Sequence, residues 1–216
     1  MKYSEQIRKI AKSYFDELDK NDFSHGFTHV QRVLTFCLVI GKKEKGDLET
    51  LEAAALLHDI ARGKEDNGEI DDHAKEGAKL AGQILKDIGF PQEKIEKVVH
   101  CIAVHRSKGE PPKTLEAKIL QDADRLDALG AIDIARVIGS SFQSKQFNRP
   151  IYIDEPYLNE GDRNKSAIHY LIHKTVHPKR KPGNFNTKTG KEIAEKRFEF
   201  SLDFVNRFIK EWHGEL

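Results

Sequence analysis

The stretch Ala53-Ala54-Ala55-Leu56-Leu57-His58-Asp59 places a histidine and an aspartate directly after five apolar residues. It belongs to a longer apolar segment, about residues 48 to 61, that predicts a buried helix. An imidazole and a carboxylate beside such a core are costly unless they are paired or bound to a cation. The His58-Asp59 pair is therefore the first candidate for a functional site.

Apolar residues recur at helical spacing through most of the chain outside this segment. Gly, Pro, Asn and Asp residues separate the periodic segments, as they do at helix ends. The pattern predicts helices at about residues 4–19, 28–45, 48–61, 71–88, 92–105, 114–129 and 165–174, followed by a final helix that ends near Trp212.

The segments between these helices favour loops. Residues 62–69 are polar, and residues 140–162 are aromatic, contain proline and lack periodicity, which predicts a long ordered loop or short strands, at 150–154 at best. Gly130 follows the helix predicted at 114–129, and the pattern does not decide whether a helix continues beyond it. Because no convincing pair of strands emerges, the predicted fold class is all-α.

Chain length and charge limit the class of protein. A chain of 216 residues fits a single domain with a substantial core. Lys and Arg total 36 against 35 Asp and Glu, so the chain lacks the basic excess that favours nucleic acid as a partner. The basic stretch 177–191 is expected to be a solvated loop or lid.

The sequence gives no sign of a membrane partner. Its longest apolar run, Val33–Ile40, is interrupted by Thr35 and is far shorter than the ~18–20 residues of a membrane helix. The N-terminus lacks the apolar segment of a signal peptide. We expect a cytoplasmic protein, and the sequence leaves its oligomeric state open.

His29 and Asp124 extend the candidate site beyond His58-Asp59. Asp124 lies between Leu120 and Leu126, within a core-facing pattern. Three helices would then bring two imidazoles and two carboxylates to one divalent cation, a mixed N/O set suited to Mn²⁺, Fe²⁺, Co²⁺, Ni²⁺ or Zn²⁺, with Mg²⁺ also open. The alternative for any single His-Asp dipeptide is a structural capping or salt-bridged pair.

The order of these residues resembles the H…HD…D signature of the HD-domain metal-dependent phosphohydrolase superfamily. The resemblance covers a core at about residues 20–140 and is strongest at Gln121–Ala128. Within the C-terminal extension, about 141–216, the tail resembles that of stand-alone bacterial HD hydrolases of the YedJ/YpgQ kind. The resemblance implies an all-helical core and one divalent metal whose ligands are His29, His58, Asp59 and Asp124, with Asp59 able to bridge two metals.

His73 and His105 resemble the additional histidines of binuclear HD proteins. At a mononuclear site the same imidazoles would instead contact substrate phosphate, and the alternative is a structural cap at a helix end. His169, His173, His177 and His213 lie outside the signature, and we expect them to be structural.

A phosphohydrolase also needs fixed positive charge for phosphate oxygens. Four cations near the candidate ligands are predicted to bind substrate: Arg62, Lys64, Arg106 and Arg125. Arg62 would also balance developing charge in the reaction. Glu65 and Asp66 are nearby acids that are predicted to take a proton from water. The alternative for each of these side chains is an ordinary solvated position.

The sequence therefore predicts a metal-dependent phosphohydrolase acting on a nucleotide or a related phosphate ester, with water activated by the metal as the nucleophile. No Gly-Tyr-Pro follows His105, which argues against cyclic di-GMP hydrolysis. Arg62-Gly63 stands where stringent-response hydrolases carry an acidic pair, which argues against hydrolysis of guanosine tetraphosphate. The alternatives are a non-catalytic HD module that senses nucleotide or metal, and a helical scaffold.

Overall fold

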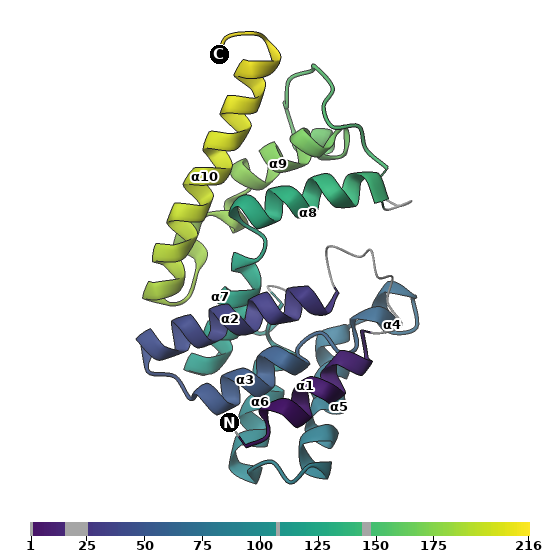
Figure 1. Cartoon of the computed structure of the whole chain (residues 1–216), viewed down its shortest axis with the longest axis vertical. Helices are drawn as coiled ribbons and strands as arrows, with labels where there is room; N and C mark the ends of the chain where they lie inside the picture. The colour runs from purple at the N-terminus through teal and green to yellow at the C-terminus, as the bar shows by residue number, and fades with distance from the viewer. Residues whose placement is uncertain (1, 16–25, 107–108, 144–147) are drawn as a thin grey trace. The chain divides into compact units, whose positions relative to one another are not determined.

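The computed structural model describes residues 2–15, 26–106, 109–143 and 148–216 (Figure 1). Within these ranges the chain forms α-helices and short 3₁₀ helices and no β-strand, which confirms the predicted all-α class. The chain divides into two compact units. Unit 1 comprises Met1–Arg125 and Asn186–Gly190, and unit 2 comprises Leu126–Phe185 and Lys191–Leu216. This division does not test the single-domain prediction, which stays a prediction.

Over its described residues, unit 1 is built from seven helices that follow most of the predicted segments. They are α1 (Ser4–Ser13), α2 (Phe27–Glu44), α3 (Leu48–Leu57), α4 (Arg62–Asp66), α5 (His73–Asp87), α6 (Gln92–Ala103) and α7 (Leu115–Leu126), whose last residue begins unit 2. Residues 16–19 of the first predicted helix lie outside the described residues. Helix α3 ends at Leu57, and residues 58–61 form turns.

The prediction of a loop at residues 62–69 is wrong for its first part, where α4 forms. The carbonyl of Ala61 accepts hydrogen bonds from the amides of Lys64 and Glu65, at 3.2 and 3.4 Å. Nε of Arg62 donates to Asp66 one turn later, at 3.0 Å. Local hydrogen bonds and an i,i+4 ion pair hold this short helix, so it needs no apolar face.

Helix α3 forms the centre of unit 1 because seven of its ten residues are apolar. Every residue from Thr50 to Leu57 is buried. Asp47 caps the helix by accepting from the amides of Glu49 and Thr50. Helix α2 packs closely on α3 at Gly41, where an added Cβ would lie only 2.5 Å from Leu51 Cδ1. This packing fixes the end of α3, where His58 and Asp59 stand.

Residues 186–190 belong to unit 1 because Asp122 on α7 holds them. Its carboxylate accepts from the amides of Asn186 and Thr187, at 2.8 and 2.7 Å, and from the Thr187 hydroxyl at 2.8 Å. Gly190 must lack a side chain there, since a Cβ would lie 2.5 Å from Asp122 Oδ2. The predicted basic loop is therefore partly anchored, and the last helix begins inside it, at Lys188.

Unit 2 consists of α8 (Gly130–Gln143), the 3₁₀ helices η1 (Glu160–Asn164), η2 (Pro178–Arg180) and η3 (Pro182–Asn184), α9 (Ala167–Val176) and most of α10 (Lys188–Trp212). Its core lies where α8, α9 and α10 meet, and consists of Ile134, Val137, Ala167, Ile168, Leu171 and Val205. Gly130, with φ of 78°, begins α8, which answers the question that the sequence left open.

The strand expected at best at residues 150–154 does not form. The carbonyls of Pro150 and Ile151 accept from the amides of Ala167 and Ile168 instead, at 2.9 and 3.0 Å. These two amides lie in the first turn of α9, where no carbonyl within the helix can reach them. The segment therefore caps a helix rather than pairing with another strand.

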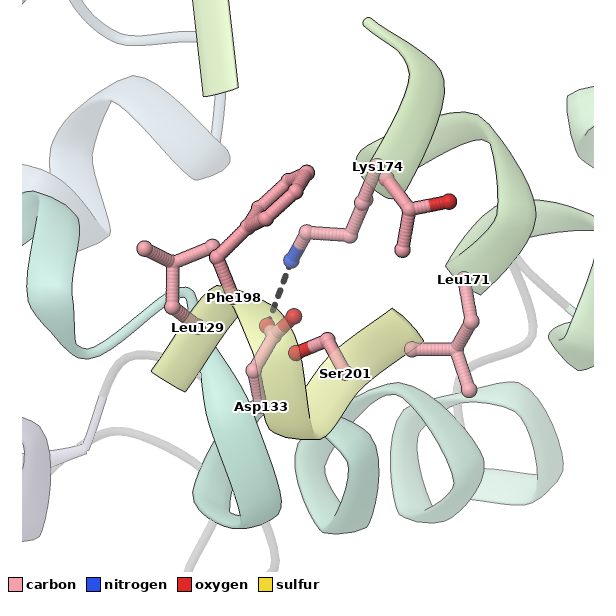
Figure 2. Close-up of a pocket in the computed structure, with 7 residues that line it drawn as sticks. Leu129, Asp133, Leu171, Lys174, Phe198 and Ser201 are labelled. Carbon is pink, nitrogen blue, oxygen red and sulfur yellow. Dashed lines mark hydrogen bonds and ion pairs between the residues drawn. The ribbon is translucent and has the colours of Figure 1, made fainter. Parts of the chain in front are cut away.

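A buried ion pair lies in a small pocket of unit 2 (Figure 2). The ammonium of Lys174 on α9 donates to the carboxylate of Asp133 on α8, between Leu129, Leu171 and Phe198. Burial lowers the pKa of Lys174 to about 8, although Asp133 opposes the shift.

Among the described residues, no helix is both long and apolar enough to span a membrane.

Candidate metal centre

Among the described residues of unit 1, six potential metal ligands converge from five places in the chain. His29 lies on α2, Asp124 lies on α7, and His58 and Asp59 follow α3. His73 is the first residue of α5, and His105 follows α6. All are buried except Asp124, which is half-buried. The structure thus brings together the four predicted metal ligands and the two additional histidines.

His29, His58 and Asp124 form the first group of ligands. Nε2 of His29 lies 3.3 Å from Asp124 Oδ1 and 3.4 Å from Nε2 of His58. One ligand atom from each of the three residues lies within 4.8 Å of the other two. A single ion can therefore reach all three side chains.

Asp59, His73 and His105 form the second group, with the same mutual spacing. Asp59 Oδ1 lies 3.1 Å from His73 Nε2 and 3.4 Å from His105 Nε2. Its other oxygen, Oδ2, lies 3.5 Å from His58 Nε2 and 3.7 Å from His29 Nε2. Asp59 therefore presents one oxygen to each pair of histidines.

Helix ends fix the orientation of two imidazoles. Nδ1 of His58 bonds to the carbonyl of Ala55 at 2.8 Å, and Nδ1 of His105 bonds to the carbonyl of Ile102 at 2.7 Å. Each carbonyl belongs to the last turn of a helix and lacks a partner within that helix. A carbonyl only accepts, so Nδ1 of each ring carries the hydrogen. In the neutral ring, Nε2 then offers a lone pair to the centre.

Electrostatics within the cluster favour ionised carboxylates. Burial alone would raise the pKa of Asp59, but the charge of His58 and the hydrogen bonds that protonated His105 and His73 donate hold it well below its ordinary value. Burial acts in the same direction on Asp124, yet the hydrogen bond and charge of His29 lower its pKa to about 2. Burial also lowers the pKa of His58, against the opposing charge of Asp59.

The arrangement fits a divalent cation. His58 has only a lone pair to offer His29 across the 3.4 Å that separates their Nε2 atoms, and carboxylate oxygens likewise only accept. Buried acceptors that face one another are destabilising unless a proton or a metal ion lies between them. Imidazole nitrogen with carboxylate oxygen is the ligand set of Zn²⁺ and of Mn²⁺, Fe²⁺, Co²⁺ and Ni²⁺.

Glu65 and Arg106 surround His73. Nδ1 and the amide nitrogen of His73 both donate to Glu65 Oε2, the latter at 3.1 Å. Nη1 of Arg106 donates to both oxygens of Glu65, at 3.0 and 3.1 Å. Burial opposes but these bonds lower the pKa of Glu65 to about 2. Glu65 thus orients an imidazole, a contact that the sequence did not suggest.

The other predicted residues lie farther out. Asp66 is exposed and accepts a hydrogen bond from Arg62. Although burial opposes the shift, the negative charge of Asp59 raises the pKa of the Arg62 guanidinium. Lys64 is exposed, and Arg125 is half-buried on α7 beside Asp124.

Gln121 holds part of the site together, a role that the sequence does not predict. Its Nε2 donates to the carbonyl of Val104 at 3.1 Å, and so joins α7 to the segment that carries His105. Gln121 stands in the motif that ends at Ala128, but its partner lies 17 positions away. The sequence contains no local signal for such a contact.

An all-α fold around a buried cluster of histidines and aspartates defines the HD class of proteins. Residues 26–129 match the HD domain, and the chain belongs to the HD-domain superfamily, as its sequence predicts. Within this superfamily it is similar to YpgQ of Bacillus subtilis (strain 168). The two are 33% identical over 219 residues, which cover 99% of this chain and 96% of YpgQ.

Solved structures give the same result. The crystal structure of B. subtilis YpgQ in complex with ADP matches with a TM-score of 0.69 and 29% identity, over 97% of this chain and 95% of that chain. An HD-superfamily hydrolase from Bacillus thuringiensis matches with a TM-score of 0.74 and 29% identity, over 98% of this chain and 97% of that chain. The chain therefore has the fold of HD-superfamily hydrolases.

Proposed function

We propose that this protein is a metal-dependent phosphohydrolase that cleaves a phosphomonoester or pyrophosphate bond of a nucleotide. The observation that carries the proposal is the convergence of His29, His58, Asp59 and Asp124 in unit 1, with Asp59 facing both His58 and His105. Membership of the HD-domain superfamily supports the hydrolytic class of the reaction.

His29, His58, Asp59 and Asp124 would hold the ion. When bound, a divalent ion supplies a Lewis acid that lowers the pKa of water and polarises a phosphoryl oxygen. His73 and His105 have two candidate roles, contact with substrate phosphate or ligation of a second ion. Their shared approach to Asp59 Oδ1 favours the second role, in which Asp59 serves both ions.

Positive side chains near the cluster are assigned to the phosphate groups. Arg62, Lys64, Arg106 and Arg125 would bind phosphate oxygens and balance charge that develops in the reaction. Arg62 and Arg106 are held in place by Asp66 and Glu65, respectively, which preorganises both guanidiniums. We assign Glu65 and Asp66 this positioning role, and keep for them the predicted alternative of accepting a proton from water.

A nucleotide is the proposed substrate class because YpgQ crystallised in complex with ADP. The same observation fits a module that binds nucleotide without hydrolysing it, which is the second candidate function. The two differ only in turnover. A release assay combined with a binding assay therefore separates them.

The test is a hydrolysis screen on protein reconstituted with Mn²⁺, Fe²⁺, Co²⁺, Ni²⁺, Zn²⁺ or Mg²⁺ in turn. Nucleoside mono-, di- and triphosphates are incubated with each form, and ³¹P NMR distinguishes released phosphate from pyrophosphate. We expect ion-dependent release that stops in excess chelator. Nucleotide binding by calorimetry without release under any ion would establish the sensor instead. Neither binding nor release would leave only the scaffold.

A further inference from the structure

A second group of metal-ligating side chains lies in unit 2, outside the proposed catalytic centre. It consists of His173 near the end of α9, His177 immediately after α9, and Glu160 in η1. One ligand atom from each lies within 4.8 Å of the others. Both histidines lie outside the family signature, and the sequence predicts a structural role for them.

Helical geometry brings the two imidazoles together. The amide of His177 donates to the carbonyl of His173 at 2.9 Å, which keeps the two residues one helical turn apart. Residues at i and i+4 lie on the same helix face. The ring centroids are 5.0 Å apart and the ring planes meet at 65°, so the rings share one face without stacking. A pair of histidines at this spacing is a common chelating unit for transition ions.

Contacts outside the group orient its members. The Tyr157 hydroxyl and Nδ1 of His173 share a hydrogen bond of 2.9 Å, which leaves Nε2 of His173 for a ligand bond. Such a bond to the second ring nitrogen is typical of metal-binding histidines. The capping box between Asn159 and Asp162 fixes the first turn of η1, and so the backbone of Glu160.

Glu160 already has one partner. Its Oε1 accepts from Nη1 of Arg163 at 2.8 Å, and the second carboxylate oxygen remains for an ion. Glu160 is exposed and the two histidines are half-buried, whereas most of the unit 1 ligands are buried. Partial exposure lowers the cost of bringing in a hydrated ion, but water and Arg163 then compete with it.

We propose that Glu160, His173 and His177 form an accessory site for a divalent transition ion, with Zn²⁺ as the preferred ion. Two imidazoles and one carboxylate are a known zinc ligand set that leaves a fourth position for water or another donor. The ion would join η1 to the end of α9 and so order this part of unit 2. The proposal does not depend on hydrolysis in unit 1.

Zinc stoichiometry of the full-length chain tests the proposal. Wild-type protein, His177→Ala and Glu160→Gln are dialysed to equilibrium against a series of buffered free Zn²⁺ concentrations, and zinc per chain is measured by elemental analysis. We expect His177→Ala to bind one ion fewer than wild type over the range in which the accessory site fills. Glu160→Gln should require at least 10-fold more free Zn²⁺ to fill it.

His213→Ala is the matched control. It removes another histidine of unit 2 whose side chain is 40% exposed and which pairs with Asp154 rather than with a ligand cluster. This variant should bind as much zinc as wild type. Equal zinc binding by wild type and His177→Ala at every concentration would overturn the proposal.

A second measurement needs no variant and so does not depend on folding. In wild-type protein labelled with ¹⁵N in its histidine rings, Zn²⁺ should shift the ring signals of His173 and His177 and leave those of His213 in place. Ring signals of His173 and His177 that stay unchanged while the unit 1 signals respond would overturn the proposal. Because the two sets of signals are read separately, the outcome is independent of the unit 1 centre.

Discussion

Two regions of the molecule bury charged side chains, and they differ in where the opposite charge comes from. In unit 2, the ammonium of Lys174 lies against the carboxylate of Asp133 within an apolar pocket (Figure 2). In unit 1, the carboxylates of Asp59 and Asp124 face imidazoles, and the Nε2 atoms of His29 and His58 also face each other. The pair in unit 2 is electrostatically complete, whereas the cluster in unit 1 gathers acceptors that a cation would satisfy.

The difference separates a structural role from a binding role. A buried pair that neutralises itself needs no ligand, and the rest of the fold offsets the desolvation of its two charges. Convergent acceptors with hydrogen bonds that fix their outer nitrogens are typical of metal-binding sites. Substitutions that remove one member should therefore act on stability in unit 2 and on metal content and hydrolysis in unit 1.

The largest expected effect is that of Asp59→Ala. Asp59 presents one oxygen to His58 and His29 and the other to His73 and His105, so its loss removes the carboxylate of the second group and an oxygen that faces the first. We expect the tightly bound ion to be lost and hydrolysis to fall by roughly 10³-fold or more, about 4 kcal/mol in barrier height. Elemental analysis and the ³¹P release assay measure the two effects.

Asp87→Ala is the control for Asp59→Ala, because Asp87 is exposed on α5 and accepts a hydrogen bond from Gln83, away from the cluster. It should keep both metal and activity. Full metal occupancy in the Asp59→Ala protein would show that the cluster is structural, like the pair in unit 2.

Lys174→Met tests the other side of the comparison. It leaves the Asp133 carboxylate buried without its partner, and we expect a loss of about 3–5 kcal/mol in the free energy of unfolding. The double variant Lys174→Met/Asp133→Leu removes both charges and should recover most of that loss. Urea denaturation measures both values.

An exposed ion pair of unit 2 gives the control for Lys174→Met. Arg207→Met breaks the contact of Arg207 with Glu211, in which both side chains are more than half exposed, and should change the free energy of unfolding very little. If Lys174→Met were no more destabilising than Arg207→Met, the buried pair would contribute little.

The pH dependence of stability provides a further test of the pair. Burial lowers the pKa of Lys174 from 10.5 to about 8 in the folded chain. Between these values the unfolded chain binds the proton and the folded chain does not, so stability rises with pH across this window. The rise should amount to about 3 kcal/mol for wild type relative to the double variant. Parallel unfolding curves from pH 8 to 10.5 would contradict the shift.

Metal removal should lower the free energy of unfolding slightly less than these changes do. It should act through the unit 1 cluster and not through the Lys174–Asp133 pair. An ion that binds only the folded chain adds about 2.7 kcal/mol to stability at 100 times its Kd. For a chain of 216 residues this corresponds to a rise in Tm of roughly 5–10 °C, which a chelator at pH 7.5 should reverse. Calorimetry should show the same chelator effect in Lys174→Met and a much smaller one in Asp59→Ala, which keeps only the accessory site of unit 2. Identical melting of wild type with and without chelator would argue against a tight ion.

The helical fold could be predicted because apolar periodicity is a local signal. Helices α2, α5 and α6 begin and end within two residues of their predicted bounds. The five-residue helix α4 escaped because it is too short and too polar to show a period. Helix α8 escaped because Gly130 reads as an interruption, although its positive φ starts a new helix.

The candidate site could be predicted in part for the same reason. His58, Asp59 and Asp124 are polar residues in apolar surroundings, which marks them in the sequence. Contacts between distant residues carry no such mark. Asp133 and Lys174 are 41 positions apart, and the bond between Glu65 and His73 joins a predicted loop to a helix start. The functional roles of the residues in the unit 1 cluster stay predictions.

The smallest expected effect is that of Glu65→Gln, which tests how the unit 1 cluster is held together. Glu65 accepts from Nδ1 of His73, whose Nε2 lies 3.1 Å from Asp59. Loss of the negative charge should weaken the orientation and basicity of the imidazole, and such changes around metal ligands cost 10- to 100-fold in affinity or activity. We expect metal affinity to fall about 10-fold, with the first group of ligands still occupied. Glu69→Gln, an exposed neighbour that contacts Asn67, is the control.

A general base would behave differently, because its removal lowers kcat at all pH values while metal affinity stays unchanged. Metal titration alongside a kcat–pH profile therefore decides whether Glu65 positions His73 or takes a proton.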